Sequence, residues 1–411
     1  MGQLGKLLAV ALAVVLVSGV STAAFYAWNA TEALADSGVD IADGDTKQLP
    51  PSIGEIEGGV NMLVVGTDSC EGQSTKLFPR CKHDPGGERN DVTMLVHIGD
   101  KPRRVTVVSF PRDMLVPIPS CPDGKGGRYS AMSSQPLNAS YMYGGLPCTV
   151  LTIKALTGLN IQFAASIRWT GVINMSDAIG GVDVCVAGRI DDRHTGLHLT
   201  KGTHTLKGKK ALQFLRTRYG VGDGSDTSRI SNQQVFMSAM LRQLKSADTL
   251  GNPVKVYSLA KAGIENIRLS KNMANIGFMQ GLAGAVKDID LKRVNFVQYP
   301  TGRHPYQSGR LTPNYELATT LFDLVESGKS FTVTSKGMAA VEEGKKGEET
   351  GTDPKDETGT GSSDEKETGS STDKTNTDKT KKKAKKTTEL PEGIPGQSAD
   401  DQTCSAGRTV F

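Results

Sequence analysis

The folded part of the chain begins with the run Val60-Asn-Met-Leu-Val-Val-Gly66, which is followed closely by Asp68. The run is short, apolar and rich in β-branched residues, as expected for a strand that is buried within a sheet. Two similar runs follow at 92–98 and 104–110, and the turn signal Gly99-Asp-Lys-Pro102 separates them. The sequence therefore predicts three strands that follow one another in the chain.

Strand patterns and helix patterns alternate through the rest of the ordered region, which is expected to end at residue 330. Alternation of this kind places helices on both faces of one sheet, and ligands bind such sheets at the strand ends. We therefore predict an α/β fold with one functional site at an edge of its sheet. Helices are expected at 149–156, 170–179, 229–245, 273–286 and 314–325, and further strands at 161–167, 182–186 and 294–299.

Charged residues stand beside the ends of the first three strands. Asp68 follows the first strand, Asp91 precedes the second, and Arg112 follows the third. Two carboxylates beside arginines make chemical sense if a divalent cation neutralises them, because Mg²⁺ takes one or two carboxylates together with waters and substrate phosphate oxygens. The alternative is that these aspartates only cap turns or pair with the arginines.

A second group of arginines lies within and after the stretch Gln213-Phe-Leu-Arg-Thr-Arg-Tyr219. Arg216 and Arg218 would share one face of a strand, and Arg229 and Gln233 would share one face of a helix. A Gly-rich turn joins the two elements, so three guanidiniums and one amide can point at one place. Guanidiniums match phosphate oxygens, which predicts a phosphate or pyrophosphate ligand. The alternative is a set of scattered surface arginines and helix salt bridges.

Composition excludes two classes of protein. The net charge of +4 and the aromatic content of 5% give no basis for nucleic-acid binding. Six cysteines occur without a CxxC pair or a His/Cys cluster, which argues against a structural zinc site. His97 lies inside an apolar run and is expected to be structural.

The N-terminus predicts a location outside the cytoplasm. Lys6 precedes an uncharged apolar run that reaches Trp28 and is long enough to span a bilayer. We expect residues 1–28 to form a short cytoplasmic end and a transmembrane anchor, and residues 29–58 to form an extracellular stalk. A cleaved signal peptide is the alternative, because small residues occur at 21–24. Both place the rest of the chain outside the cytoplasm, and the uncleaved anchor would hold the extracellular folded part at the cell membrane.

An oxidising location makes disulfides the expected state of the cysteines. Cys70 and Cys81 bracket one polar loop, so we predict that they pair. A second bridge is expected within the set Cys121, Cys148 and Cys185, and Cys404 stands alone in the tail. Free buried thiols are the alternative.

From residue 331 to residue 411 we predict a disordered, low-complexity tail, because the composition shifts to Gly, Ser, Thr and charged residues. The lysine-rich run at 381–386 would bind an anionic polymer or lipid, or would simply be a solvated charge run.

These charged and glycine-rich segments resemble those of the LytR-CpsA-Psr family, in its actinobacterial form. The matching segments occur in the family's order over residues 60–245. They are Val64-Val-Gly-Thr-Asp68, Arg89-Asn-Asp-Val-Thr93, Val108-Ser-Phe-Pro-Arg-Asp113, Leu137-Asn-Ala-Ser-Tyr141 with Gly144-Gly145, Asp177-Ala-Ile-Gly-Gly-Val182, Leu206-Lys-Gly-Lys-Lys-Ala-Leu212 with Arg216-Thr-Arg218, and Asp226-Thr-Ser-Arg229 with Gln233. Asn90 departs from the Ser or Thr that is usual in its motif.

The resemblance implies a membrane-anchored phosphotransferase that moves a glycopolymer from a polyprenyl-pyrophosphate carrier onto peptidoglycan. It implies a three-layer α/β/α sandwich around a central mixed sheet over residues 59–330. It also implies an apolar tunnel for the polyprenyl chain, and apolar residues of 170–245 would line that tunnel or form ordinary core. The implied catalytic residues are Arg112, Asp68 and Asp91, with Mg²⁺ or Mn²⁺ on Asp68 and Asp91. The implied pyrophosphate-binding residues are Arg89, Arg112, Arg216, Arg218, Arg229 and Gln233.

Phosphoryl transfer depends on positioning and on neutralising charge, which arginines and a divalent cation provide. Arg112 or Asp113 would assist the removal of the proton from an acceptor hydroxyl. Two other functions stay open: a hydrolase that cleaves the same lipid pyrophosphate with water, and a non-catalytic surface protein that binds wall polymer.

Overall fold

The computed structural model describes residues 38–41, 59–70, 73, 75–76, 78–83, 88–99, 103–273, 281–282, 284, 287–343 and 388–409. The predicted transmembrane anchor, most of the predicted stalk, most of the helix expected at 273–286 and the lysine-rich run lie outside these ranges. Within them, no helix combines the length and the apolar character that a membrane crossing requires.

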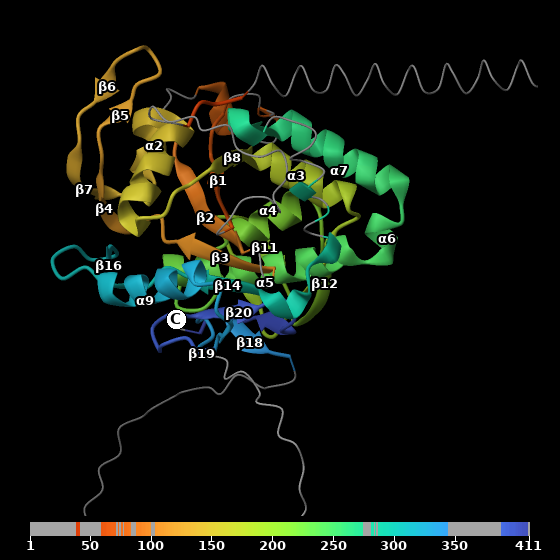
Figure 1. Ribbon diagram of the computed structural model, residues 1–411. Coiled ribbons are helices and arrows are strands. Elements are labelled where there is room, and N and C mark those ends of the chain that lie inside the picture. The colour runs from red at the N-terminus through yellow and green to blue at the C-terminus, as the bar shows by residue number, and fades with distance from the viewer. Residues whose placement is uncertain are drawn as a thin grey trace, which may run out of the picture.

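A seven-stranded mixed sheet forms the centre of the molecule (Figure 1). The strand β1 pairs in parallel with β8, and β3 pairs in parallel with β14, whereas the other neighbours are antiparallel. The central mixed sheet of the predicted fold class is therefore confirmed. In spatial order the strands are β13 (Ile267–Leu269), β8 (Phe163–Arg168), β1 (Val60–Thr67), β2 (Asn90–Gly99), β3 (Arg104–Phe110), β14 (Val294–Gln298) and β20 (Gly396–Ser398).

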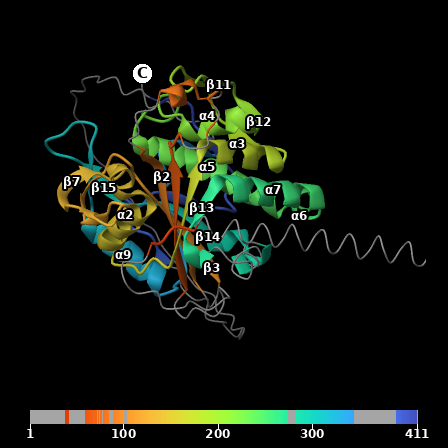
Figure 2. The same cartoon turned by 90° about the horizontal axis from the view of Figure 1, so that it is seen from above.

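Helices cover both faces of this sheet (Figure 2). Leu63 and Val65 pack into a core with α2 (Ala139–Thr157) and α9 (Tyr315–Glu326) on one face. Val64, next to them in the chain, points to the other face, because successive side chains of a strand alternate. There α5 (Asp226–Lys245) packs on the sheet, and α3 (Trp169–Ala178), α4 (Gly208–Arg216) and α7 (Pro253–Asn266) lie on the same side.

A second, four-stranded sheet covers the other side of α5. Its order is β12 (Gly202–Leu206), β9 (Val182–Val186), β21 (Thr403–Ser405) and β18 (Ala340–Glu342). Apolar side chains of β9, α4 and α5 form a core beneath it, among them Val184, Phe214 and Phe236. These residues of the 170–245 region thus pack as core, the alternative to lining a tunnel.

The predicted disordered tail is wrong at both of its ends. Residues 331–343 and 388–409 are ordered, and β20 extends the central sheet by pairing with β14 (Figure 1). The strand β21 joins the second sheet. Leu390, Ile394 and Ala399 are buried. The long charged stretch between these ends dominates the composition of the whole tail. The few apolar residues at the ends therefore have little effect on that average, although they are sufficient to pack on the rest of the fold.

All six cysteines form disulfides. The pair Cys70–Cys81 is confirmed, and Cys121–Cys148 is the second bridge that was expected within its set. Cys404, which stands alone in the tail sequence, forms a third bridge that was not predicted, with Cys185 across 219 residues of sequence. The two partners lie on β9 and β21, which are neighbouring strands of the second sheet.

Candidate active site

Three strand ends meet at one edge of the central sheet. Thr67, the last residue of β1, pairs with Asn90 at the start of β2, and β3 ends just before Arg112. This arrangement brings Asp68, Asp91 and Arg112 together, as the sequence predicts. They line a pocket of about 370 Å³, and the other residues of its wall are Phe78, Pro79, Trp169 and Arg216.

Arg112 is the centre of the charge network at this edge. Its Nη1 donates to Oδ1 of Asp91, and its backbone N–H donates to Oδ2 of Asp226 at 2.9 Å. Burial alone would lower the pKa of Arg112, but the charges of Asp91, Asp226 and Asp113 outweigh it and raise that pKa. Arg112 therefore stays charged, which suits an anion-binding residue, and the expectation that it assists proton removal stays a prediction.

Arg229 lies behind Arg112, in the first turn of α5. Its Nη2 is 2.7 Å from Oδ1 of Asp226 and donates to the backbone oxygen of Asp91 at 2.9 Å. Burial lowers the pKa of Arg229, and the neighbouring charge of Asp226 acts against that shift. The Nε atoms of Arg112 and Arg229 are buried without a hydrogen-bond partner, so the protein leaves part of the donor capacity of both guanidiniums unused.

The predicted strand with Arg216 and Arg218 on one face is wrong. Residues 213–216 are the last turn of α4, and the backbone becomes extended only at Thr217. Helical spacing buries Ala211, Leu212 and Phe214 of α4 on one side, and this pattern outweighs the two-residue spacing of the arginines. The two guanidiniums therefore point to different partners.

Arg216 stays at the pocket, and Arg218 lies beside it. The guanidinium carbon of Arg216 is 3.8 Å from the centre of the Trp169 ring, a cation–π contact on the pocket wall. Arg218 donates from Nε to the backbone oxygen of Gly224 at 2.9 Å, and its Nη1 is 3.3 Å from Oδ2 of Asp113. Asp113 thus fixes the guanidinium of Arg218.

Sequence reasoning missed a further arginine at Asp113. Nη1 of Arg310 is 3.0 Å from Oδ1 of Asp113, and Oδ2 of Asp113 lies 3.3 Å from Nη1 of Arg218 and 4.0 Å from Nε of Arg112. Asp113 therefore positions arginines, and the expectation that it assists proton removal stays a prediction. Arg310 directly precedes β16 (Leu311–Pro313), outside every motif of the sequence. Trp169 was missed as well, and no sequence signal pointed to either residue.

Gln233 and Arg89 are not pocket residues. Gln233 lies on one helix with Arg229, as predicted, but it is buried and its Nε2 donates to the backbone oxygen of Leu215 at 2.8 Å. It therefore joins α5 to α4. The backbone N–H of Arg89 donates to Oδ1 of Asp68 at 2.7 Å, whereas its side chain is exposed and does not line the pocket. Arg89 thus orients Asp68 through its backbone.

The two predicted metal-binding carboxylates line the same pocket. Within the described ranges, no group of three or more His, Cys, Asp or Glu residues could hold a metal ion. Asp68 and Asp91 nevertheless fit Mg²⁺, because this ion is bound by one or two carboxylates and completes its shell with waters and substrate phosphates. They do not form a cage for a permanently bound metal.

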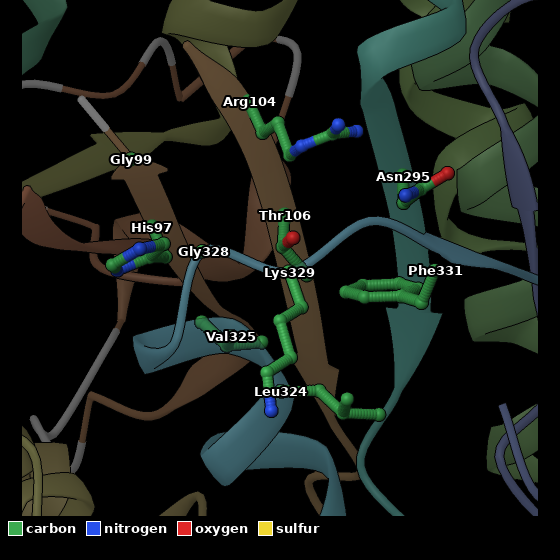
Figure 3. A pocket seen from close by; sticks show the side chains of 10 residues that line it. All are labelled: His97, Gly99, Arg104, Thr106, Asn295, Leu324, Val325, Gly328, Lys329 and Phe331. Atoms are coloured by element: carbon green, nitrogen blue, oxygen red, sulfur yellow. The ribbon is translucent and has the colours of Figure 1, made fainter. Parts of the chain in front are cut away.

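A small cavity of about 30 Å³ lies at the other edge of the sheet, with room for about one water molecule (Figure 3). His97 lines it, and its Nδ1 is 2.8 Å from Oδ1 of Asn61. Burial lowers the pKa of His97 to about 4. His97 is therefore structural, as predicted.

Comparison with known proteins places the chain in a family. The family model described as "LytR_cpsA_psr family" matches residues 24–320. The chain is 27% identical over 299 residues to "Cell wall biosynthesis protein LcpA" of Corynebacterium glutamicum, an alignment that covers 67% of this chain and 56% of LcpA. It is 25% identical over 278 residues to "Polyisoprenyl-teichoic acid--peptidoglycan teichoic acid transferase TagT" of Bacillus subtilis, which covers 63% of this chain and 79% of TagT.

Solved structures agree on the fold. The structure of "LytR-Csp2A-Psr enzyme from Actinomyces oris" matches with a TM-score of 0.53 and 23% identity, and covers 70% of this chain and 95% of that one. The chain spans about half the length of the first curated relatives it matches. From the extent of the family match, which includes every residue of the pocket, we conclude that the chain belongs to the LytR_cpsA_psr family.

Proposed function

We propose that this chain is a membrane-anchored phosphotransferase that moves a glycopolymer from a polyprenyl-pyrophosphate carrier onto peptidoglycan. The observation that carries the proposal is the pocket in which Arg112 and Arg216 face Asp68 and Asp91. The name of TagT, a transferase of teichoic acid from a polyisoprenyl carrier to peptidoglycan, supports the same reaction class. LcpA, another relative, is named as a cell wall biosynthesis protein.

The reaction exchanges one phosphorus–oxygen bond for another. An acceptor hydroxyl attacks the phosphorus that carries the glycopolymer, the bond to the bridging oxygen breaks, and the proton of the hydroxyl passes to solvent. The products are a phosphodiester and a polyprenyl phosphate. Negative charge grows on the leaving phosphate, and fixed guanidiniums stabilise that charge without having to reorganise.

Each arginine has a distinct part in this proposal. Arg112 and Arg216 line the pocket and would bind the pyrophosphate oxygens directly. Arg229 is nearly fully buried and contacts both Asp226 and the backbone of Asp91, so it supports the positive potential from behind. Arg218 is held at the side of the pocket by Asp113.

We assign Mg²⁺ or Mn²⁺ to Asp68 and Asp91 as part of the proposal. When bound, the ion would neutralise charge on the pyrophosphate. The protein prepares Asp68 by the hydrogen bond from the backbone N–H of Arg89, and Asp91 by its contact with Arg112. The predicted anchor at 1–28 would keep this site at the outer face of the cell membrane, where peptidoglycan is built, and three disulfides fit that oxidising location.

The test uses the full chain in detergent. It is incubated with a polyprenyl-pyrophosphate-linked saccharide and a labelled peptidoglycan oligosaccharide, with Mg²⁺ or with a chelator. Mg²⁺-dependent transfer of the saccharide, with release of lipid monophosphate, is the expected result. Lipid cleavage without transfer would indicate a hydrolase, and binding of the saccharide without any lipid turnover would indicate a wall-polymer-binding protein.

A further inference from the structure

The end of the chain lies against the loop that carries Arg218. Residues 219–224 connect the end of α4 to the N-terminal turn of α5, and residues 403–409, the C-terminal segment, run along them. Val221 forms an isolated β-bridge with Gly407, and Gly222 forms another with Arg408. Two parts of the chain that are far apart in sequence therefore meet beside the candidate active site.

Hydrogen bonds fix this contact on both sides of Gly222. The N–H of Gly222 donates to the oxygen of Gly407 at 3.1 Å, and the N–H of Thr409 donates to the oxygen of Gly222 at 2.8 Å. Nη1 of Arg408 donates to the backbone oxygen of Tyr219 at 3.3 Å. The C-terminal segment thus provides hydrogen-bond partners for the backbone of this loop.

The contact continues from the loop to Arg218. The N–H of Gly224 donates to the oxygen of Val221 at 3.1 Å, and the oxygen of Gly224 accepts the bond from Nε of Arg218 at 2.9 Å. A shift of Val221 would therefore move the acceptor that orients this guanidinium. Glycines at 220, 222 and 224 give the free loop many backbone conformations, so its order depends on outside contacts.

The same segment also holds α5. Ser405 Oγ donates to Oδ1 of Asn232, a residue one turn after Arg229. The N–H of Ala406 donates to the oxygen of Ala339 at 3.0 Å, and the N–H of Ala339 donates to Oγ of Ser231 at 3.2 Å. The C-terminal segment therefore contacts both the loop that precedes α5, which follows Arg218, and α5 itself, which carries Arg229.

Two features keep the segment in its place. The disulfide Cys185–Cys404 ties it to β9. Gly407 allows the backbone to approach Arg189 closely, because a Cβ on Gly407 would lie 2.2 Å from the oxygen of Arg189. Any larger residue at 407 would have to displace this contact.

We propose that the C-terminal segment is a positioning element for the transfer reaction, which sets the geometry of Arg218 by clamping residues 219–224. This inference rests on the proposed function. The segment does not touch the reacting atoms, so its effect passes through Arg218. Misplacement of a binding group by about 1 Å can cost about 100-fold in rate, so loss of the clamp is expected to lower kcat by about 10- to 100-fold.

The experiment compares the full chain with a chain that ends at residue 406. A chain that ends at 409 is the matched control, because it keeps every contact named above. Transfer kinetics, thermal unfolding and amide hydrogen exchange are measured on all three. We expect the chain ending at 406 to stay folded, to exchange the Gly222 amide faster and to lose kcat, while the control behaves as the full chain does. Gly407→Val, which keeps the length, should reproduce the loss.

A double-mutant cycle separates positioning from general support. In an Arg218→Lys background the truncation should cost much less than in the wild type, because effects that act through one residue are not additive. Equal losses in both backgrounds, unchanged kcat, or unchanged exchange at Gly222 would each overturn the clamp. Absence of transfer in the full chain and the control would instead refute the proposed function.

Discussion

The backbone N–H of Arg112 donates to the carboxylate of Asp226 at 2.9 Å, and this bond joins the end of the central sheet to the first turn of α5. The other oxygen of Asp226 is 2.7 Å from Arg229 and 3.6 Å from Nε of Arg112. One buried carboxylate therefore holds together two guanidiniums that would otherwise repel each other. Two elements of the site are fixed by a residue that does not line the pocket.

Asp226→Asn keeps the shape of this side chain and removes its charge. Breaking a buried ion pair by removing one partner costs about 3–5 kcal/mol, so we expect the variant to lose stability of that order and most of its transfer activity. Urea unfolding and the transfer assay measure the two effects. Asp191→Asn, at an exposed pair with Arg189, is the control and should change stability by less than about 0.5 kcal/mol. Equal stability of the two variants would contradict this account of Asp226.

Arg218→Ala is expected to abolish transfer while the fold stays intact. Arg218 is partly exposed and contacts Asp113 and the loop oxygen of Gly224, so its removal leaves no deeply buried charge. Arg112→Ala should abolish transfer as well, but it also deprives Asp91 and Asp226 of a partner, so a lower unfolding temperature is expected. Circular dichroism and the transfer assay separate these results. Arg189→Ala, at an exposed arginine, serves as control, and near-normal transfer by Arg218→Ala would count against the proposed function.

The buried His97 predicts a loss of stability in weak acid. Burial lowers its pKa in the folded protein from the ordinary 6.5 to about 4, so the unfolded chain takes up the proton first. The contribution of neutral His97 to the free energy of unfolding is fully present above pH 6.5 and is lost as the pH drops from 6.5 toward about 4. His97→Gln should flatten the pH dependence of urea unfolding over this range. Equal curves for the wild type and His97→Gln would refute the prediction.

The sequence was sufficient to place the residues that stand at strand ends. Asp68 and Arg112 follow strands whose apolar patterns are clear, and Asp91 stands at the start of another such strand. The topology of a sheet then brings such residues to one edge. Residue spacing also indicated Arg216, Arg218 and Arg229, but their contacts depend on tertiary structure. Two arginines that are two residues apart fit a strand, but they also fit the end of a helix that is followed by an extended residue. Only the packing of Phe214 in the core shows that the helix forms.

Residues far along the chain were beyond sequence reasoning for a physical reason. Arg310 and the C-terminal segment reach the site through long-range contacts that have no local signal. Ser, Thr and Gly in the segment resemble a flexible tail by composition, whereas in the fold they are bound because α5 and β9 present unpaired backbone and polar groups to them.

Asn90, which departs from the family motif, is buried and donates to Thr93 at 2.6 Å.

The order of residues 388–409 changes where the domain can be cut. A chain that ends at 335, which the predicted boundary at 330 would permit, loses β18, β20, β21 and the Cys185–Cys404 bond. It also loses the bonds from Nε2 of Gln397 to Gln234 and Ser238 of α5. Removing a native disulfide alone typically costs about 2–5 kcal/mol, so we expect this chain to unfold at a much lower urea concentration or to aggregate. A chain that ends at 409 should unfold as the full chain does. If the chain ending at 335 matched it in both urea midpoint and transfer activity, the ordered C-terminal strands would be dispensable, and the shorter boundary predicted from composition would be the correct one.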